Sequence, residues 1–110
     1  MSTFKFPVIN SVLHNDLRLK IMVALDSLES ADFVYLCQIT DSTRGNLSVQ
    51  IKTLQNAGYL EVDKSRLGRF SHTSCRITSK GREALRIYED GLRNLFVKGV
   101  PAQEKKQKTG

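Results

Sequence analysis

Several features are scarce in this sequence of 110 residues, and each absence excludes a class of protein. No apolar run approaches the length of about 18 residues that a membrane-spanning helix requires. The first residues lack a basic segment followed by an apolar run and a cleavage site, so we expect no export signal. Cys37 and Cys75 lie far apart and outside any CxxC pattern, which leaves neither a disulfide framework nor zinc-ligand spacing. We therefore expect a cytoplasmic protein with no membrane segment and no metal site.

The motifs that enzymes use for covalent or phosphoryl chemistry are also missing. The sequence has no glycine-rich phosphate loop, no nucleophile elbow, and no carboxylate pair with a partner histidine. His72 precedes Cys75 by three residues and His14 is the other histidine. A buried cysteine and a polar histidine on an exposed strand face account for such a pair more simply than a metal site does. We predict no catalytic residue, no metal and no cofactor.

The apolar pattern predicts two helices in the first part of the chain. Apolar residues recur at intervals of three and four over residues 13–28, with Asn15 or Asp16 as the N-cap. Ser30 or Asp32 then provides the N-cap of a short second helix. Its apolar face consists of Phe33, Leu36 and Cys37.

A third helix is predicted over residues 43–57, followed by a hairpin and a last helix. Gly58 stands where a left-handed residue ends the third helix. Strands are expected at residues 60–63 and 70–77, joined by a turn at residues 65–69. Thr78 and Ser79 cap the last helix, whose apolar band comprises Ala84, Leu85, Tyr88, Leu92, Leu95 and Phe96.

This order of elements defines the expected fold. Helix, helix, helix, hairpin and helix form the layout of a winged helix-turn-helix, a mainly α fold with a small β-hairpin. The length suits one domain, which we place at residues 1–98. Residues 99–110 are polar and lysine-rich, and we expect a disordered basic tail there.

The positive charge is concentrated in the centre of the chain. The net charge is +6 overall, and residues 42–82 carry eight basic residues against two acidic ones. No acidic residue occurs between Ser42 and Leu60. A basic segment on a predicted helix and hairpin is typical of proteins that bind polyanions.

The predicted third helix has an inner and an outer face. Leu47, Ile51 and Leu54 point to the core, and amide, hydroxyl and basic groups lie on the other sides. Asn and Gln pair with adenine, and Arg or Lys pairs with guanine, in a major groove about 12 Å wide. A solvated surface helix has a similar outer face. The basic tip of the following hairpin favours DNA binding over that alternative.

Three segments resemble winged-helix regulators of the MarR-like and ArsR-like type. Residues 43–60 (TRGNLSVQIKTLQNAGYL) resemble the recognition helix of these families and the strand after it. Residues 17–22 (LRLKIM) resemble their first helix, and residues 77–82 (ITSKGR) resemble the start of the helix after the wing. The resemblance spans roughly residues 10–97 and implies a dimeric transcriptional regulator that binds double-stranded DNA.

The resemblance implies a set of DNA-binding residues in the helix at 43–57 and in the wing at 64–71. The set comprises Thr43, Arg44, Asn46, Ser48, Val49, Gln50, Lys52, Lys64, Arg66 and Arg69. Arsenic-type regulators often carry Arg and His at the positions of Val49 and Gln50. Val49 offers only apolar contact, such as with a thymine methyl group.

The last helix is more apolar than one domain requires, and the surplus predicts a homodimer. We expect the interface to include Leu85, Tyr88, Leu92, Leu95 and Phe96, with help from the N-terminal Phe4, Phe6, Val8 and Ile9. The alternative is that the same residues are buried within one chain. A two-fold dimer presents two recognition helices to half-sites about 34 to 36 Å apart.

Other functions remain open for this fold. A winged helix also serves as a protein-docking or RNA-binding module, and a regulator of this class can sense a metal or a small molecule. The charge of residues 42–82 favours DNA over protein docking. No paired thiolate motif supports a metal sensor, and the sequence does not identify a small-molecule effector.

Overall fold

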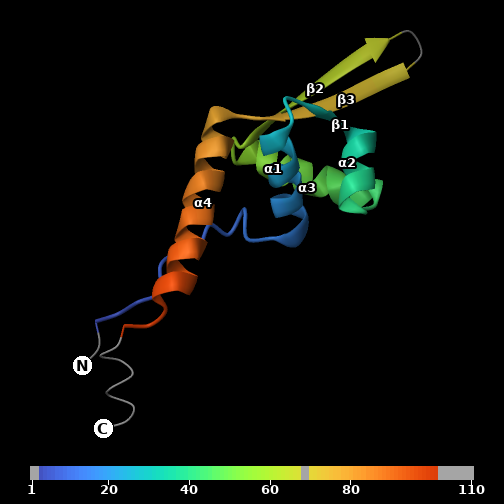
Figure 1. The fold of residues 1–110 in the computed structure, drawn as a ribbon. Coiled ribbons are helices and arrows are strands. Elements are labelled where there is room, and N and C mark those ends of the chain that lie inside the picture. Colours follow the sequence, from blue (N-terminus) through green and yellow to red (C-terminus); the bar gives the residue numbers. More distant parts are fainter. Residues whose placement is uncertain (1–2, 68–69, 102–110) are drawn as a thin grey trace.

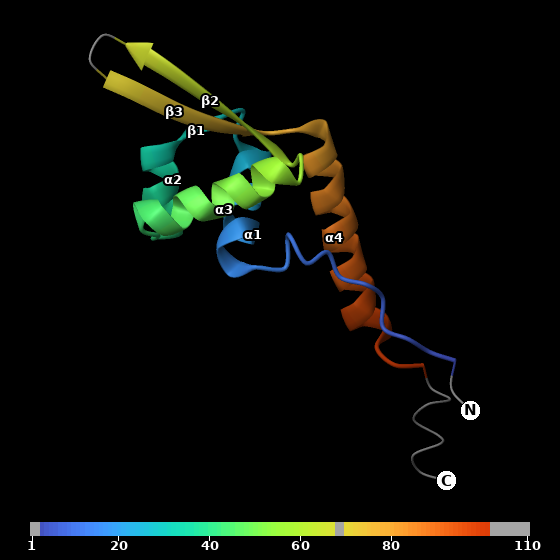
Figure 2. The same ribbon diagram turned by 180° about the vertical axis from the view of Figure 1, so that it is seen from behind.

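The computed structural model describes residues 3–67 and 70–101, and these residues form a winged helix. The elements are α1 (Asp16–Ser27), β1 (Ala31–Asp32), α2 (Phe33–Thr40), α3 (Arg44–Asn56), β2 (Leu60–Leu67), β3 (Phe70–Ile77) and α4 (Ser79–Lys98). Helices α1 to α3 form a cluster from which the β2–β3 hairpin and α4 extend in different directions (Figure 1). The N-terminal segment runs beside the far half of α4, as the opposite view in Figure 2 also shows. The predicted fold class is confirmed, and the predicted helices and hairpin occur in the predicted order, with β1 in addition.

Local capping chemistry determines where each helix begins. Before every helix, a side-chain oxygen accepts a hydrogen bond from a backbone N–H in the first turn. The capping residues are Asn15 for α1, Asp32 for α2, Thr43 for α3 and Thr78 for α4. Gly58 follows α3 with a φ of 81°, the left-handed conformation predicted for it.

The sheet differs from the predicted hairpin in two respects. It has three antiparallel strands in the order β1-β3-β2, because Ala31 pairs with Cys75 and Asp32 with Ser74. Strand β2 also continues to Leu67, so the turn predicted at residues 65–69 was too long. The sequence of residues 64–67 lacks apolar alternation, and this end of the hairpin projects beyond the helix cluster (Figure 1).

The inner face of α3 packs into the core against the other helices. Leu47, Ile51 and Leu54 are buried there, as predicted. They join fully buried residues of α1 and α2, of which Ile21, Met22, Leu25 and Leu36 are the largest. Each such side chain stabilises the fold by about 1.5–3 kcal/mol. No helix in the described ranges is long and apolar enough to cross a membrane.

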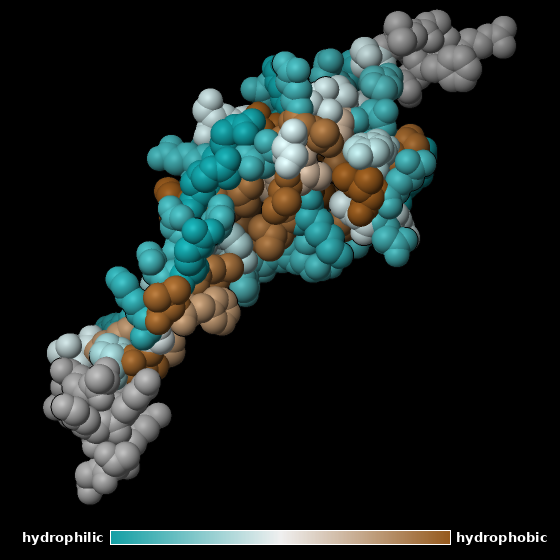
Figure 3. Space-filling view, in the orientation of Figure 1, coloured by the Kyte–Doolittle hydropathy of each residue, from teal (hydrophilic) through white to brown (hydrophobic). Residues whose placement is uncertain are grey.

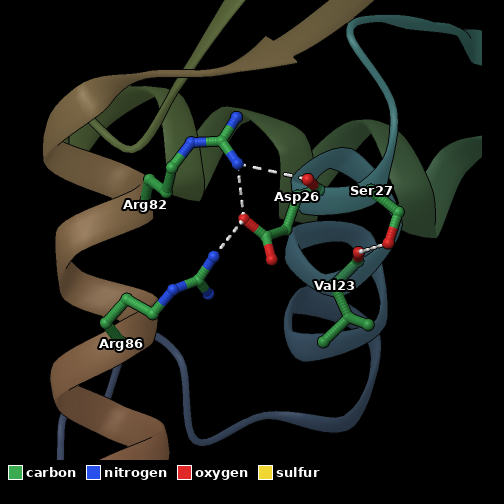
Figure 4. Close-up of polar contacts among 5 residues, drawn as sticks. All are labelled: Val23, Asp26, Ser27, Arg82 and Arg86. Atoms are coloured by element: carbon green, nitrogen blue, oxygen red, sulfur yellow. Dashed lines mark hydrogen bonds and ion pairs between the residues drawn. The ribbon is translucent and has the colours of Figure 1, made fainter.

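Two arginines of α4 fix its orientation across the end of α1 (Figure 4). The Nη1 of Arg82 donates to Oδ1 of Asp26 at 2.7 Å and to its backbone oxygen at 3.2 Å. The Nη2 of Arg86 donates to the same Oδ1 at 3.1 Å. These cations also complement the negative end of the α1 dipole. Because the arginines are about half exposed, these ion pairs add little to the stability of the fold, and their main effect is to orient α4 relative to α1.

Candidate nucleic-acid interface

The outer face of α3 is a rigid, exposed surface without acidic groups. Leu47, Ile51 and Leu54 bind the helix to the core, so its opposite side is fixed in solvent. The exposed residues there are Arg44, Gly45, Asn46, Ser48, Val49, Lys52, Gln55 and Asn56. Thr43 is also exposed, and its hydroxyl caps the helix. Side chains that donate and accept hydrogen bonds thus lie along one accessible face of a helix of 13 residues.

The first turn of α3 carries an arginine, Arg44, that contacts α2. The guanidinium of Arg44 lies 5.9 Å from the ring centroid of Phe33 in α2, a cation–π distance. This contact joins the two helices of the helix-turn-helix at the surface. The backbone N–H groups at the start of α3 add a positive partial charge beside Arg44. The arrangement suits an anionic group such as a phosphate.

Gln50 is less available than the sequence indicated. Its side chain is half-buried, and its Oε1 accepts a hydrogen bond of 2.5 Å from Nη1 of Arg18. Its Nε2 donates to Oδ1 of Asn46 at 3.2 Å. Both ends of the Gln50 amide are therefore engaged within the protein.

Sequence reasoning gave Arg18 no role at the site. Arg18 lies in α1, remote in sequence from α3, and its only signal was a match to a family-like segment. The contact with Gln50 comes from the packing of α1 against α3. Periodicity within either helix does not encode it.

The hairpin supplies fewer free cations than its sequence suggests. Lys64 is exposed on β2, whereas Arg76 donates to Glu61 at 2.6 Å across the strands. Arg66 belongs to β2, but its side chain lies outside the described residues, as does the whole of Arg69. Arg82 also pairs with Asp26, so part of the positive charge of residues 42–82 is used in ion pairs within the protein.

Both cysteines and His14 occupy structural positions. Cys75 is 1% exposed, and burial raises the pKa of its thiol to about 11, so it stays protonated at neutral pH. Cys37 packs against the core, and the two thiols form no disulfide. Nδ1 of His14 lies 2.9 Å from the hydroxyl of Tyr88. Residues 3–67 and 70–101 contain no group of three or more candidate metal ligands.

The residues predicted for a dimer interface divide into two groups. Leu85 and Tyr88 are buried in the core of their own chain, which leaves them little surface for a partner. The alternative of burial within one chain therefore holds for these two. Leu92 and Leu95 are half-buried, while Phe96 is 83% exposed.

The fold and the outer face of α3 together define a winged-helix DNA-binding regulator. A family model described as a winged helix DNA-binding domain matches residues 17–96. An uncharacterised protein of Methanocaldococcus jannaschii, MJ0432, is 37% identical over 81 residues, covering 74% of this chain and 84% of that protein. The chain belongs to the winged helix DNA-binding domain family.

Solved structures share this architecture. The chain is similar to a transcriptional regulator homologue from Pyrococcus horikoshii, with a TM-score of 0.73, 29% identity, and coverage of 77% of this chain and 84% of that one. A MarR-family transcriptional regulator from Silicibacter pomeroyi has a TM-score of 0.61 at 16% identity, with coverage of 88% and 66%. The resemblance to MarR-like regulators seen in the sequence is thereby confirmed at the level of the fold.

Proposed function

We propose that the protein binds duplex DNA with sequence preference as a homodimeric transcriptional regulator. Helix α3 enters the major groove, and the hairpin lies along the backbone or in the adjacent minor groove. The observation that carries the proposal is the outer face of α3, which is exposed, rigidly supported, and free of acidic side chains. This function and the two free thiols suit a cytoplasmic protein.

The groups on this face suit two kinds of contact. Arg44 and Lys52 provide positive charge for phosphates, which fixes position without reading sequence. Asn46 and Ser48 in the first turns provide short polar groups for base edges, and Val49, 59% exposed, suits a thymine methyl group. The N-terminal part of a recognition helix is the part that reaches the bases.

The dimer is supported by apolar surface at the far half of α4. Phe96 and Val97 are 83% and 78% exposed, and Phe6 on the adjacent N-terminal segment is 65% exposed. Figure 3 shows apolar surface near this end of α4, away from the helix cluster. A second copy related by a two-fold axis covers such a patch and presents two α3 helices to one duplex.

The direct test of DNA binding is selection from a pool of random duplexes, followed by affinity measurement over salt concentration. We expect enrichment of a pseudo-palindrome. Its affinity should fall by at least about a thousandfold between about 50 and 200 mM salt if about six phosphates are contacted. Binding that is indifferent to salt, or an equal affinity for single-stranded RNA in the same measurement, contradicts the proposal.

The dimer is tested with Phe96→Ser. Removing the most exposed aromatic of the patch should raise the dissociation constant of the dimer about tenfold or more, since buried aromatic anchors dominate interfaces. Analytical ultracentrifugation at micromolar concentration measures it. Val34→Ser, at a valine 50% exposed on α2, is the control and should leave the dimer intact. A wild-type protein that sediments only as a monomer refutes the dimer.

A further inference from the structure

Three hydrogen bonds hold the guanidinium of Arg18 in one orientation. Its Nε donates to the backbone oxygen of Val12 at 2.6 Å, and its Nη2 to that of Ser11 at 3.4 Å. Both carbonyls belong to the segment before α1. Because the guanidinium is planar and its donors are fixed in a fork, these contacts also determine where the remaining donor points. That donor, Nη1, meets Oε1 of Gln50 at 2.5 Å.

The contact with Arg18 determines how the side-chain amide of Gln50 is oriented. Arginine has only donors, so Gln50 faces it with its oxygen and turns its amino group to the other side. There, Nε2 of Gln50 donates to Oδ1 of Asn46 at 3.2 Å. Asn46 is one helical turn before Gln50, on the same side of α3. The chain of hydrogen bonds therefore runs from α1 to the exposed first turn of α3.

The amide of Asn46 is oriented as a result. Its oxygen faces Gln50, so its Nδ2 group, with two N–H donors, points away from Gln50. No hydrogen-bond partner for Nδ2 occurs among residues 3–67 and 70–101. Asn46 is exposed and lies in the part of α3 that reaches the bases.

We propose that Arg18 is a specificity-determining positioning residue, which acts through Gln50 to present Nδ2 of Asn46 to a base acceptor in the major groove. The inference rests on the proposed DNA-binding function. Paired recognition of adenine requires Asn to accept and donate at once, whereas here the oxygen is directed at Gln50. Asn46 then prefers an edge that offers acceptors alone, such as O6 and N7 of guanine or O4 of thymine. Gln50 orients Asn46 and does not itself read a base.

The test compares base preferences selected by Asn46→Ala, Arg18→Met and Arg18→Lys. Asn46→Ala identifies the base pair that Asn46 reads. Both Arg18 variants should lower discrimination at that same pair about tenfold, because neither methionine nor lysine reproduces the fork. The dependence of affinity on salt should not change, since Arg18 touches no phosphate in this arrangement. Thermal unfolding of each variant shows that it is folded.

Three results overturn the inference. If Arg18→Met keeps the wild-type preference at the Asn46 base pair, Arg18 does not position Asn46. If it weakens all sequences equally with a shallower salt dependence, Arg18 contacts a phosphate. If Gln50→Ala changes the preference at a different base pair, Gln50 reads a base directly. A double variant that combines Arg18→Met with Asn46→Ala should lose no more base preference than Asn46→Ala alone.

A measurement without DNA separates this inference from the proposed function. The side-chain amide signals of Asn46 and Gln50 in the NMR spectrum of the free, folded protein should shift in Arg18→Met. Lys20→Met, an exposed position two residues along α1, is the control and should leave them in place. Unchanged amide signals in Arg18→Met overturn the chain of contacts. A wild-type protein that binds no duplex refutes the proposed function instead.

Discussion

Replacing Gly81 with alanine is expected to destabilise the fold by about 3 kcal/mol or more, and chemical denaturation measures the loss. A Cβ atom at Gly81 would lie 2.1 Å from the backbone oxygen of Tyr59 and 2.8 Å from its carbonyl carbon. The obstacle is the backbone of Tyr59, directly before β2, so no side-chain rotation relieves it. Thr78 fixes the same junction, with its N–H donating to Tyr59 at 3.0 Å and its hydroxyl to Gly58 at 2.6 Å. Moving α4 away from Tyr59 disrupts these bonds.

Gly91→Ala is the matched control on the same helix. A Cβ atom at Gly91 meets no atom within 4 Å, and the residue lies in the interior of α4. Alanine should therefore stabilise the protein by about 0.5–1 kcal/mol, because it restricts the unfolded chain and favours the helix. Equal stability of Gly81→Ala and the wild type would show that α4 does not approach Tyr59 so closely.

Features determined by neighbouring residues were predictable from the sequence. The N-caps follow from hydroxyl, amide or carboxyl groups directly before apolar periodicity, as at Thr43 and Thr78. The inner face of α3 follows from the spacing of Leu47, Ile51 and Leu54. Gly58 has the predicted left-handed backbone because a helix ends there.

Features that depend on tertiary packing were not predictable. Strand β1 has two residues, too few for any period, and exists only because β3 pairs with it. Hydrophobic spacing in α4 did not separate Leu85 and Tyr88, which enter the core, from Phe96, which does not. The contact between Arg18 and Gln50 joins residues 32 positions apart and depends on the packing of α1 and α3. The sequence therefore indicated which helix we propose as the DNA-reading helix, but not which of its amides are free of contacts within the protein.

Replacing Arg44 and Lys52 together with glutamine is expected to weaken duplex binding about a hundredfold at about 0.1 M salt. Both residues are exposed on α3, and their separation of eight residues corresponds to about 12 Å along the helix axis. At this separation the two cations are expected to contact different phosphates. Fluorescence anisotropy over a range of salt concentrations measures the affinity.

The salt dependence distinguishes lost phosphate contacts from lost base contacts. Removing two phosphate contacts should reduce the slope of log affinity against log salt by about two and leave the preferred sequence unchanged. The double variant Lys20→Gln and Arg93→Gln removes the same charge from α1 and α4, where both side chains are exposed in ion pairs along their own helices. It should change the slope little, because screening limits the reach of distant charges to about 10 Å. If both double variants weaken binding equally, net charge and not the outer face of α3 determines the affinity.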